Sequence, residues 1–137
     1  MTPSLPANLQ REHALMLDSR RAACCAVIED DRARARDRLA ALARQQARHI
    51  SHAEIRLLSR LPLHLRKSSE VYLAEHRKLE SLLQHIQTQW HALPVHLAEP
   101  TQRLALLDAL HPLRHVLEHH CEREEQALHI ETLETHL

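Results

Sequence analysis

The stretch "YLAEHRKLESLLQHIQTQW", residues 72–90, repeats its apolar and aromatic residues at alternating intervals of four and three. The positions concerned are Tyr72, His76, Leu79, Leu83, Ile86 and Trp90. This spacing places one side chain from each helical turn on the same face, so it predicts an amphipathic helix. Because His76 belongs to that face, we expect an imidazole on the buried side of the helix.

The composition extends the helical prediction to the whole chain. The 137 residues include twenty-six leucines but no glycine, no phenylalanine, one tyrosine and one tryptophan. Strands and tight hairpins favour β-branched, aromatic, glycine and asparagine residues, whereas leucine and alanine favour helices. A chain of this length can bury one hydrophobic core. We therefore predict that residues 1–137 form a single all-α domain.

Breakers and caps divide the chain into four helical segments. The first is predicted over residues 5–28. The aspartates at 30–31 can cap a second helix, which is expected to end before Pro62. A fourth helix is predicted to begin near Thr101 and to be kinked at Pro112, because proline cannot donate a helical hydrogen bond. Four long helices with short connections predict an up-down-up-down four-helix bundle.

Each of the four predicted apolar faces contains a histidine. These residues are His13, His49, His76 and His120. A rise of about 1.5 Å per residue places the two histidines of each half within about one turn of the same height. An unpartnered imidazole in an apolar interior is unfavourable. The pattern therefore predicts that the four side chains share partners in the bundle.

A weak internal repeat supports the same layout. "REHALMLDS", residues 11–19, parallels "AEHRKLESL", residues 74–82, and both begin an amphipathic run with a Glu-His pair. "RHISHAEIRLL", residues 48–58, parallels "HHCEREEQAL", residues 119–128. The two halves of the chain thus carry their histidines in matching positions.

With these motifs the chain resembles the hemerythrin-like, or HHE cation-binding, family over nearly its whole length. The resemblance implies a four-helix bundle that holds two irons, bridged by an oxygen species and carboxylates, with histidines from all four helices. Transferred to the matching positions of this chain, it implies a set of metal ligands. They are His13, His49, His76 and His120, with Glu124 or Glu125.

Two positions depart from the family pattern. Ala53 stands four residues after His49, where the family has a bridging carboxylate, and Glu54 follows one position later, about 100° further round the helix. Glu54 is therefore an alternative ligand. Tyr72 stands four residues before His76, where hemerythrins with five histidines have another histidine. Tyr72 can ligate iron(III) as a phenolate, or it can be a core tyrosine with a hydrogen-bonded hydroxyl.

The remaining histidines fall outside the predicted ligand set. We expect a plain surface role for the six that lie in loops or off the apolar faces, namely His64, His85, His91, His96, His129 and His136. Four others lie near the edges of the faces and are candidate hydrogen-bond partners of the ligands. These are His52, His111, His115 and His119.

The resemblance implies a non-heme iron protein, with a di-iron centre, that binds or senses O₂, NO or peroxide, or that handles iron. Imidazole and carboxylate ligands also suit manganese or zinc. The alternative is a metal-free interaction module of the same fold, for which Ala53 is the main support and Cys24 and Cys25 allow a homodimer. An enzyme is less favoured, because the chain has no recognisable phosphate-binding loop or nucleophile motif.

The charge balance limits the range of partners. Eighteen basic and eighteen acidic residues cancel, so the electrostatic attraction that non-specific nucleic-acid binding requires is missing. No stretch approaches the roughly 20 apolar residues of a membrane span, and the start of the chain does not resemble a signal peptide. We therefore expect a cytoplasmic protein without a nucleic-acid or membrane partner.

Overall fold

The computed structural model describes residues 5–57, 66–93 and 99–135, and it describes side chains over 7–55, 70–93 and 99–127. These residues form four α-helices and one π-helical segment, and no strand occurs among them. The elements are α1 (Leu5–Ile28), α2 (Arg32–His52), the π-helix η1 (Ala53–Leu57), α3 (Arg66–Ala92) and α4 (Pro100–Thr135).

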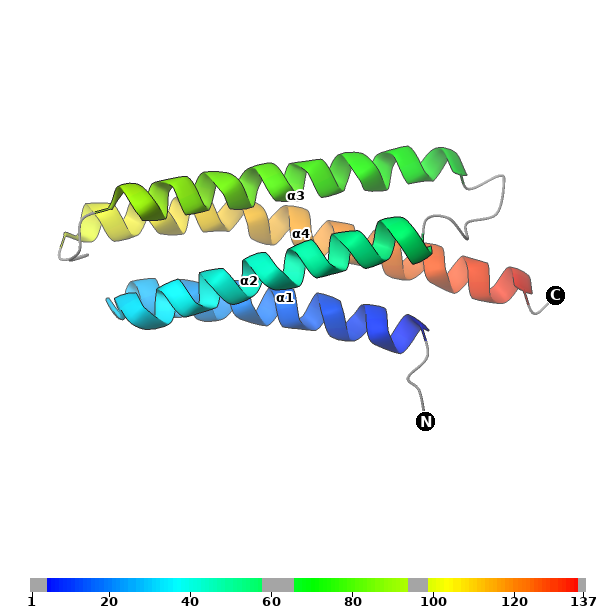
Figure 1. The fold of residues 1–137 in the computed structure, drawn as a ribbon, viewed down its shortest axis with the longest axis horizontal. Helices are drawn as coiled ribbons and strands as arrows, with labels where there is room; N and C mark the ends of the chain where they lie inside the picture. Colours follow the sequence, from blue (N-terminus) through cyan, green and yellow to red (C-terminus); the bar gives the residue numbers. More distant parts are fainter. Residues whose placement is uncertain (1–4, 58–65, 94–98, 136–137) are drawn as a thin grey trace.

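The helices pack side by side and alternate in direction (Figure 1). Helix α1 packs on α2 and α4, and α3 packs on α4. Among the four neighbouring pairs, α2 and α3 contact each other least. The start of α1 and the end of α4 lie at the same end of the molecule. The predicted all-α, up-down-up-down four-helix bundle is confirmed.

The core is aliphatic and lies along the bundle axis. Its largest fully buried apolar side chains are Met16, Leu42, Leu79, Ile86, Leu106, Leu110, Leu113 and Leu117. Full burial of one such side chain is worth about 1.5–3 kcal/mol relative to its exposure. The core lies between the level of the four histidines and the C-terminal ends of α1 and α3. A rigid apolar base therefore holds the helices that carry the histidines.

The turn between α1 and α2 has the cap that the sequence predicts. Asp31 accepts a hydrogen bond from the backbone N–H of Arg34 at 3.1 Å, which satisfies a free donor of the first helical turn. Asp30 adopts a left-handed conformation, with φ of 57°, and reverses the chain. At the same end the guanidinium of Arg32 lies 5.2 Å from the centre of the Trp90 ring. These contacts join the α1–α2 turn to the end of α3.

The predicted second helix changes its form before Pro62, which lies outside the described residues. It widens into the π-helix η1, where the N–H of Ala53 meets the carbonyl oxygens of both His49 and Ile50. A π-helical turn contains an extra residue, and such turns are frequent at functional sites. Helix α4 continues through Pro112. No helix in the described part of the chain has both the length and the apolar character needed to cross a membrane.

Candidate metal centre

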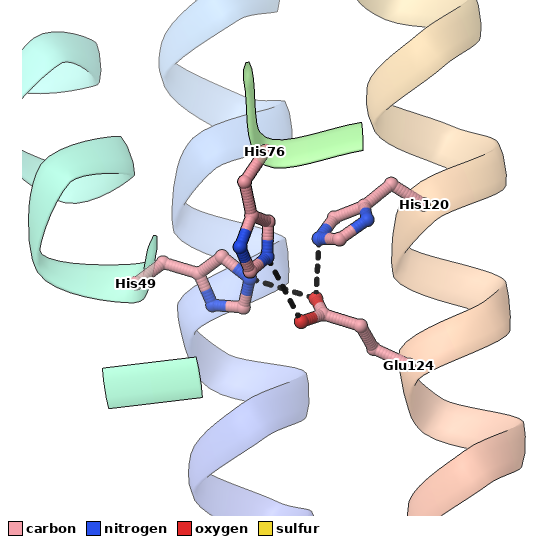
Figure 2. Close-up of side chains that lie close together, drawn as sticks. All are labelled: His49, His76, His120 and Glu124. Carbon is pink, nitrogen blue, oxygen red and sulfur yellow. Dashed lines mark hydrogen bonds and ion pairs between the residues drawn. The ribbon is translucent and has the colours of Figure 1, made fainter. Parts of the chain in front are cut away.

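Four buried histidines, one from each helix, converge on the carboxylate of Glu124. The Nε2 atoms of His49 and His120 each lie 2.7 Å from Glu124 Oε1. His13 Nε2 lies 3.0 Å from the same oxygen, and His76 Nε2 lies 3.4 Å from Oε2. Figure 2 shows His49, His76 and His120 turned toward Glu124 from three helices. The prediction that the four imidazoles share a partner is confirmed.

The donor atoms of this cluster suit a transition metal. His49, His76, His120 and Glu124 each offer one ligand atom, and these atoms all lie within 4.8 Å of one another. Imidazole nitrogen with carboxylate oxygen suits iron, manganese or zinc better than magnesium or calcium, which prefer all-oxygen ligands. The four residues are fully buried, so an ion held there would be shielded from water.

Three nitrogens of the four histidines have no hydrogen-bond partner among the described residues, namely His13 Nδ1, His49 Nδ1 and His120 Nε2. His120 Nε2 lies close to Glu124, but the approach lacks the alignment of a hydrogen bond. A buried polar atom without a partner costs about 1–3 kcal/mol. An ion bound between the imidazole and the carboxylate would supply that partner. The residues present therefore fit a metal ion.

An outer ring of glutamates faces the Nδ1 atoms of the same histidines. The pairs are Glu12 with His49, Glu54 with His76, Glu75 with His120, and Glu125 with His13. Their N–O distances are 3.9, 3.2, 3.4 and 3.6 Å respectively. Each glutamate reaches the histidine of the next helix along the chain, and the pair from α4 to α1 closes the ring. Two of these contacts, Glu54 with His76 and Glu75 with His120, are hydrogen bonds, and the other two are longer approaches between oppositely disposed groups.

Hydrogen bonds to the outer ring favour Nε2 as the metal-binding nitrogen of His76 and His120. An imidazole that donates its Nδ1 proton to a carboxylate keeps its Nε2 lone pair free, and such partners orient metal-bound histidines in proteins. Two of the glutamates are themselves held by arginines. Arg77 lies 3.1 Å from Glu54, and Arg123 lies 3.0 Å from Glu75. The arrangement directs four Nε2 atoms inward.

Three of the predicted ligands lie at the margin of this cluster. Glu54 and Glu125 belong to the outer ring and face Nδ1 atoms. The Tyr72 hydroxyl donates a hydrogen bond to the backbone carbonyl of Arg123 at 3.2 Å. Burial, reinforced by nearby glutamate charges, raises the pKa of Tyr72 and keeps it a neutral phenol. The structure therefore brings the four predicted histidines together with Glu124 and places the other three around them.

The other described histidines lie either at the edge of the buried cluster or on the surface of the bundle. His52 Nδ1 lies 3.3 Å from Glu12, so this histidine shares the outer carboxylate of His49. Five more are exposed, namely His85, His91, His111, His115 and His119. The side chains of His64, His96, His129 and His136 lie outside the described part of the chain.

Sequence reasoning missed Glu12 and Glu75. Both were visible as the first member of the Glu-His pairs that begin the internal repeat. Neighbours in sequence point about 100° apart on a helix, so each glutamate serves a histidine of another helix and not the one beside it. The repeat therefore contains a recognisable signal, a Glu-His pair followed in the next helix by a histidine with a glutamate five residues later.

Burial and hydrogen bonding oppose each other at the centre. Burial alone would raise the pKa of Glu124, but the imidazoles close to its carboxylate, His120 first, hold its pKa far below the usual range. Burial lowers the pKa of His76, but hydrogen bonds and charges from Glu124 and Glu54 outweigh it and raise the pKa. Without metal, the cluster therefore favours an ionised Glu124 and a protonated His76.

These pKa shifts predict that the stability of metal-free protein and that of metal-loaded protein change in opposite directions with pH. A raised histidine pKa stabilises the fold below about pH 6.5 and loses that effect as pH rises through the folded-state value. We expect the melting temperature of metal-free protein to fall as the pH rises above about 6.5. Metal competes with protons for imidazole, so metal-loaded protein should gain stability over the same range. Thermal melts across that range check this, and parallel profiles for both forms would contradict it.

Comparisons of the chain with protein-family models, with curated proteins and with solved structures found no match. Within the described residues, the buried cluster is the one group of three or more histidine, cysteine or acidic side chains arranged to hold a metal ion. The candidate centre is therefore inferred from its own residues and contacts.

Proposed function

We propose that this protein is a non-heme iron protein of the hemerythrin-like kind, which binds iron in the buried cluster. The observation that carries the proposal is the convergence of four imidazoles, from four helices, on one fully buried carboxylate. An apolar interior that served only packing would not favour four polar rings and a carboxylate at one level. Glu54 and Glu75 add to this, because their hydrogen bonds with Nδ1 orient the rings of His76 and His120 as ligands.

The geometry supports one tightly held ion per chain. Glu124 is the only carboxylate that the Nε2 atoms face among the described residues. Two ions would place four or more positive charges in a medium of low dielectric, which one carboxylate neutralises poorly. A di-iron pair would have to draw on further carboxylates, such as those of Glu54 and Glu125. Metal stoichiometry decides between one ion and two.

We infer that the role is the binding or sensing of a small diatomic ligand. Bound iron(II) would supply reversible attachment of O₂ or NO at an open coordination position. The chain's own part is to fix four imidazoles, exclude bulk water and admit a small molecule. A groove of about 500 Å³ between α2 and α3 is lined in part by Ile50, Glu54 and Leu83. Because Glu54 also contacts His76, this groove ends beside the cluster.

The test is the metal content of purified protein with an optical spectrum of the same sample. We expect about one iron per chain after expression with sufficient iron, and its loss with a strong chelator. Charge-transfer absorption should appear with the metal and change when NO is added to the reduced protein. Well under one metal ion of any kind per chain would overturn the proposal.

The second candidate function is a metal-free interaction module, which Ala53 favours because it removes a carboxylate from the ligand face. Chelation separates the two. A ligand that binds only the folded state stabilises it by about 2.7 kcal/mol at a hundredfold excess over its dissociation constant. We expect chelated protein to melt several degrees lower than loaded protein. An unchanged melt after verified metal removal would favour the module.

A further inference from the structure

The outer face of α4 carries a ladder of histidines that the buried cluster does not use. His111, His115 and His119 follow one another at intervals of four residues, and all three are exposed. Residues four apart lie one above the other on a helix surface. The rings of His115 and His119 are in contact, with centres 4.4 Å apart and planes inclined at 66°. The face therefore presents paired imidazoles to solvent.

This pair has the dimensions of a metal chelate. Two imidazoles that share one ion through bonds of about 2.0–2.1 Å, at angles of roughly 90–110°, have ring centres roughly 4.5–5 Å apart. The observed 4.4 Å is close to that range, and exposed side chains can adjust by small rotations. Imidazole nitrogen is a ligand for copper, nickel and zinc, with copper(II) bound most strongly.

The surroundings leave the pair available. The carboxylate of Glu118, between the two histidines in sequence, lies 3.0 Å from the guanidinium of Arg114. This ion pair is internally balanced, so it adds little net repulsion to an approaching cation. Within the described residues, neither imidazole of the pair forms a hydrogen bond or an ion pair. The two rings contact each other.

We propose that His115 and His119 form a surface site for a divalent transition-metal ion of the copper, nickel or zinc class, separate from the buried cluster. His119 and the buried ligand His120 are neighbours in sequence but point about 100° apart around α4, so that one is exposed and the other fully buried. One helix thus carries two metal-binding faces. Solvent completes the coordination of the ion at the outer face, so it exchanges more readily there than inside.

His115 is the decisive residue, because it belongs to both four-residue steps of the ladder. His115→Ala removes the pair with His119 and also the equivalent step to His111. His111→Ala leaves the observed pair intact. His85→Ala is the matched control, since His85 is an exposed histidine of another helix, α3. All three substitutions change exposed side chains and should leave the fold stable.

The experiment is a calorimetric titration of the protein with Cu²⁺ at about pH 7.5, because a proton competes with a metal ion for an imidazole nitrogen at lower pH. We expect His115→Ala to weaken one Cu²⁺ equivalent by about tenfold or more, because a single imidazole loses the advantage of chelation. His111→Ala and His85→Ala should match the parent. Electron paramagnetic resonance of the Cu²⁺ equivalent that His115→Ala weakens, taken as the difference between parent and variant spectra, should show coupling to two nitrogens.

Identical isotherms for His115→Ala and His85→Ala would overturn the proposal. A loss with His111→Ala as large as that with His115→Ala would also overturn it, because the observed pair would then be insufficient. The buried cluster is assayed separately by iron content, which all three variants should retain. Each result is a difference between variants, so it holds whether or not the buried cluster takes up metal.

Discussion

Replacing Glu124 with glutamine is expected to abolish iron binding, with retention below about a tenth of the parent's metal content under equal loading. Glu124 is the one carboxylate that the four inward nitrogens share, and glutamine has its shape without its charge. Its amide would also turn N–H donors toward nitrogens that must act as ligands. Iron content and charge-transfer absorption of Glu124→Gln measure the loss. The metal-free variant should lose about 3–5 kcal/mol of unfolding free energy, because buried imidazoles lose their counter-charge.

The control for this variant is the neighbouring substitution Glu125→Gln. Glu125 faces His13 Nδ1 from the outer ring and is about one-third exposed. Loss of an outer partner typically weakens metal affinity by about 10–100-fold, so the variant should still fill when iron is in excess. Circular dichroism of both variants verifies the fold. Full metal content in Glu124→Gln, or complete loss in Glu125→Gln, would contradict the assignment of inner and outer carboxylates.

Replacing Ala53 with glutamate is expected to raise the metal capacity from about one ion per chain toward two. Ala53 is buried and stands four residues after His49, as Glu124 stands four residues after His120. The substitution would place a second carboxylate on the ligand face and offset the charge of a second ion. Without metal, the added buried charge should cost a few kcal/mol, and loading should restore that loss. Metal stoichiometry and paired melts of loaded and chelated protein check both effects.

Ala53→Gln is the matched control, because it adds the same volume without charge. It should lower stability through crowding and leave the stoichiometry at one. Glu54→Ala provides a second comparison, since Glu54 contacts His76 and Arg77. This variant should weaken iron affinity while keeping the single site. A second metal equivalent in Ala53→Gln, or no second equivalent in Ala53→Glu, would show that charge at position 53 does not limit the number of metal ions bound.

The sequence predicted the bundle and the inner cluster because both depend on local periodicity. Alternating intervals of three and four fix which side chains of a helix face the core. Once His49 and His120 share such faces, a bundle with short links brings them to similar heights. Glu124 follows from the same rule, because it lies one turn after His120. The features that the structure confirms are those that depend on the spacing of residues within a single helix.

The outer ring could not be predicted in the same way, because its contacts join different helices. Whether Glu75 meets His76 or His120 depends on the rotation of α3 relative to α4, which sequence spacing does not contain. Glu54 illustrates the same limit, since η1 alters the angular positions that a regular α-helix would give. The surface pair on α4 was visible as spacing, but its exposure depended on how deeply α4 is buried.

Because of the π-helix η1, the number of residues between His49 and Glu54 decides whether the Glu54 carboxylate can face the metal cluster. An extra residue within a continuous helix is equivalent to a one-residue insertion. Deleting Ala53 would let the helix close into regular α-turns and would move the present Glu54 to four residues after His49, the spacing that joins Glu124 to His120. A change of one codon in length, with no new side chain, would then supply a second inner carboxylate. In a lineage of such bundles, the number of metal ions could thus be altered by an insertion or a deletion without any substitution among the ligands.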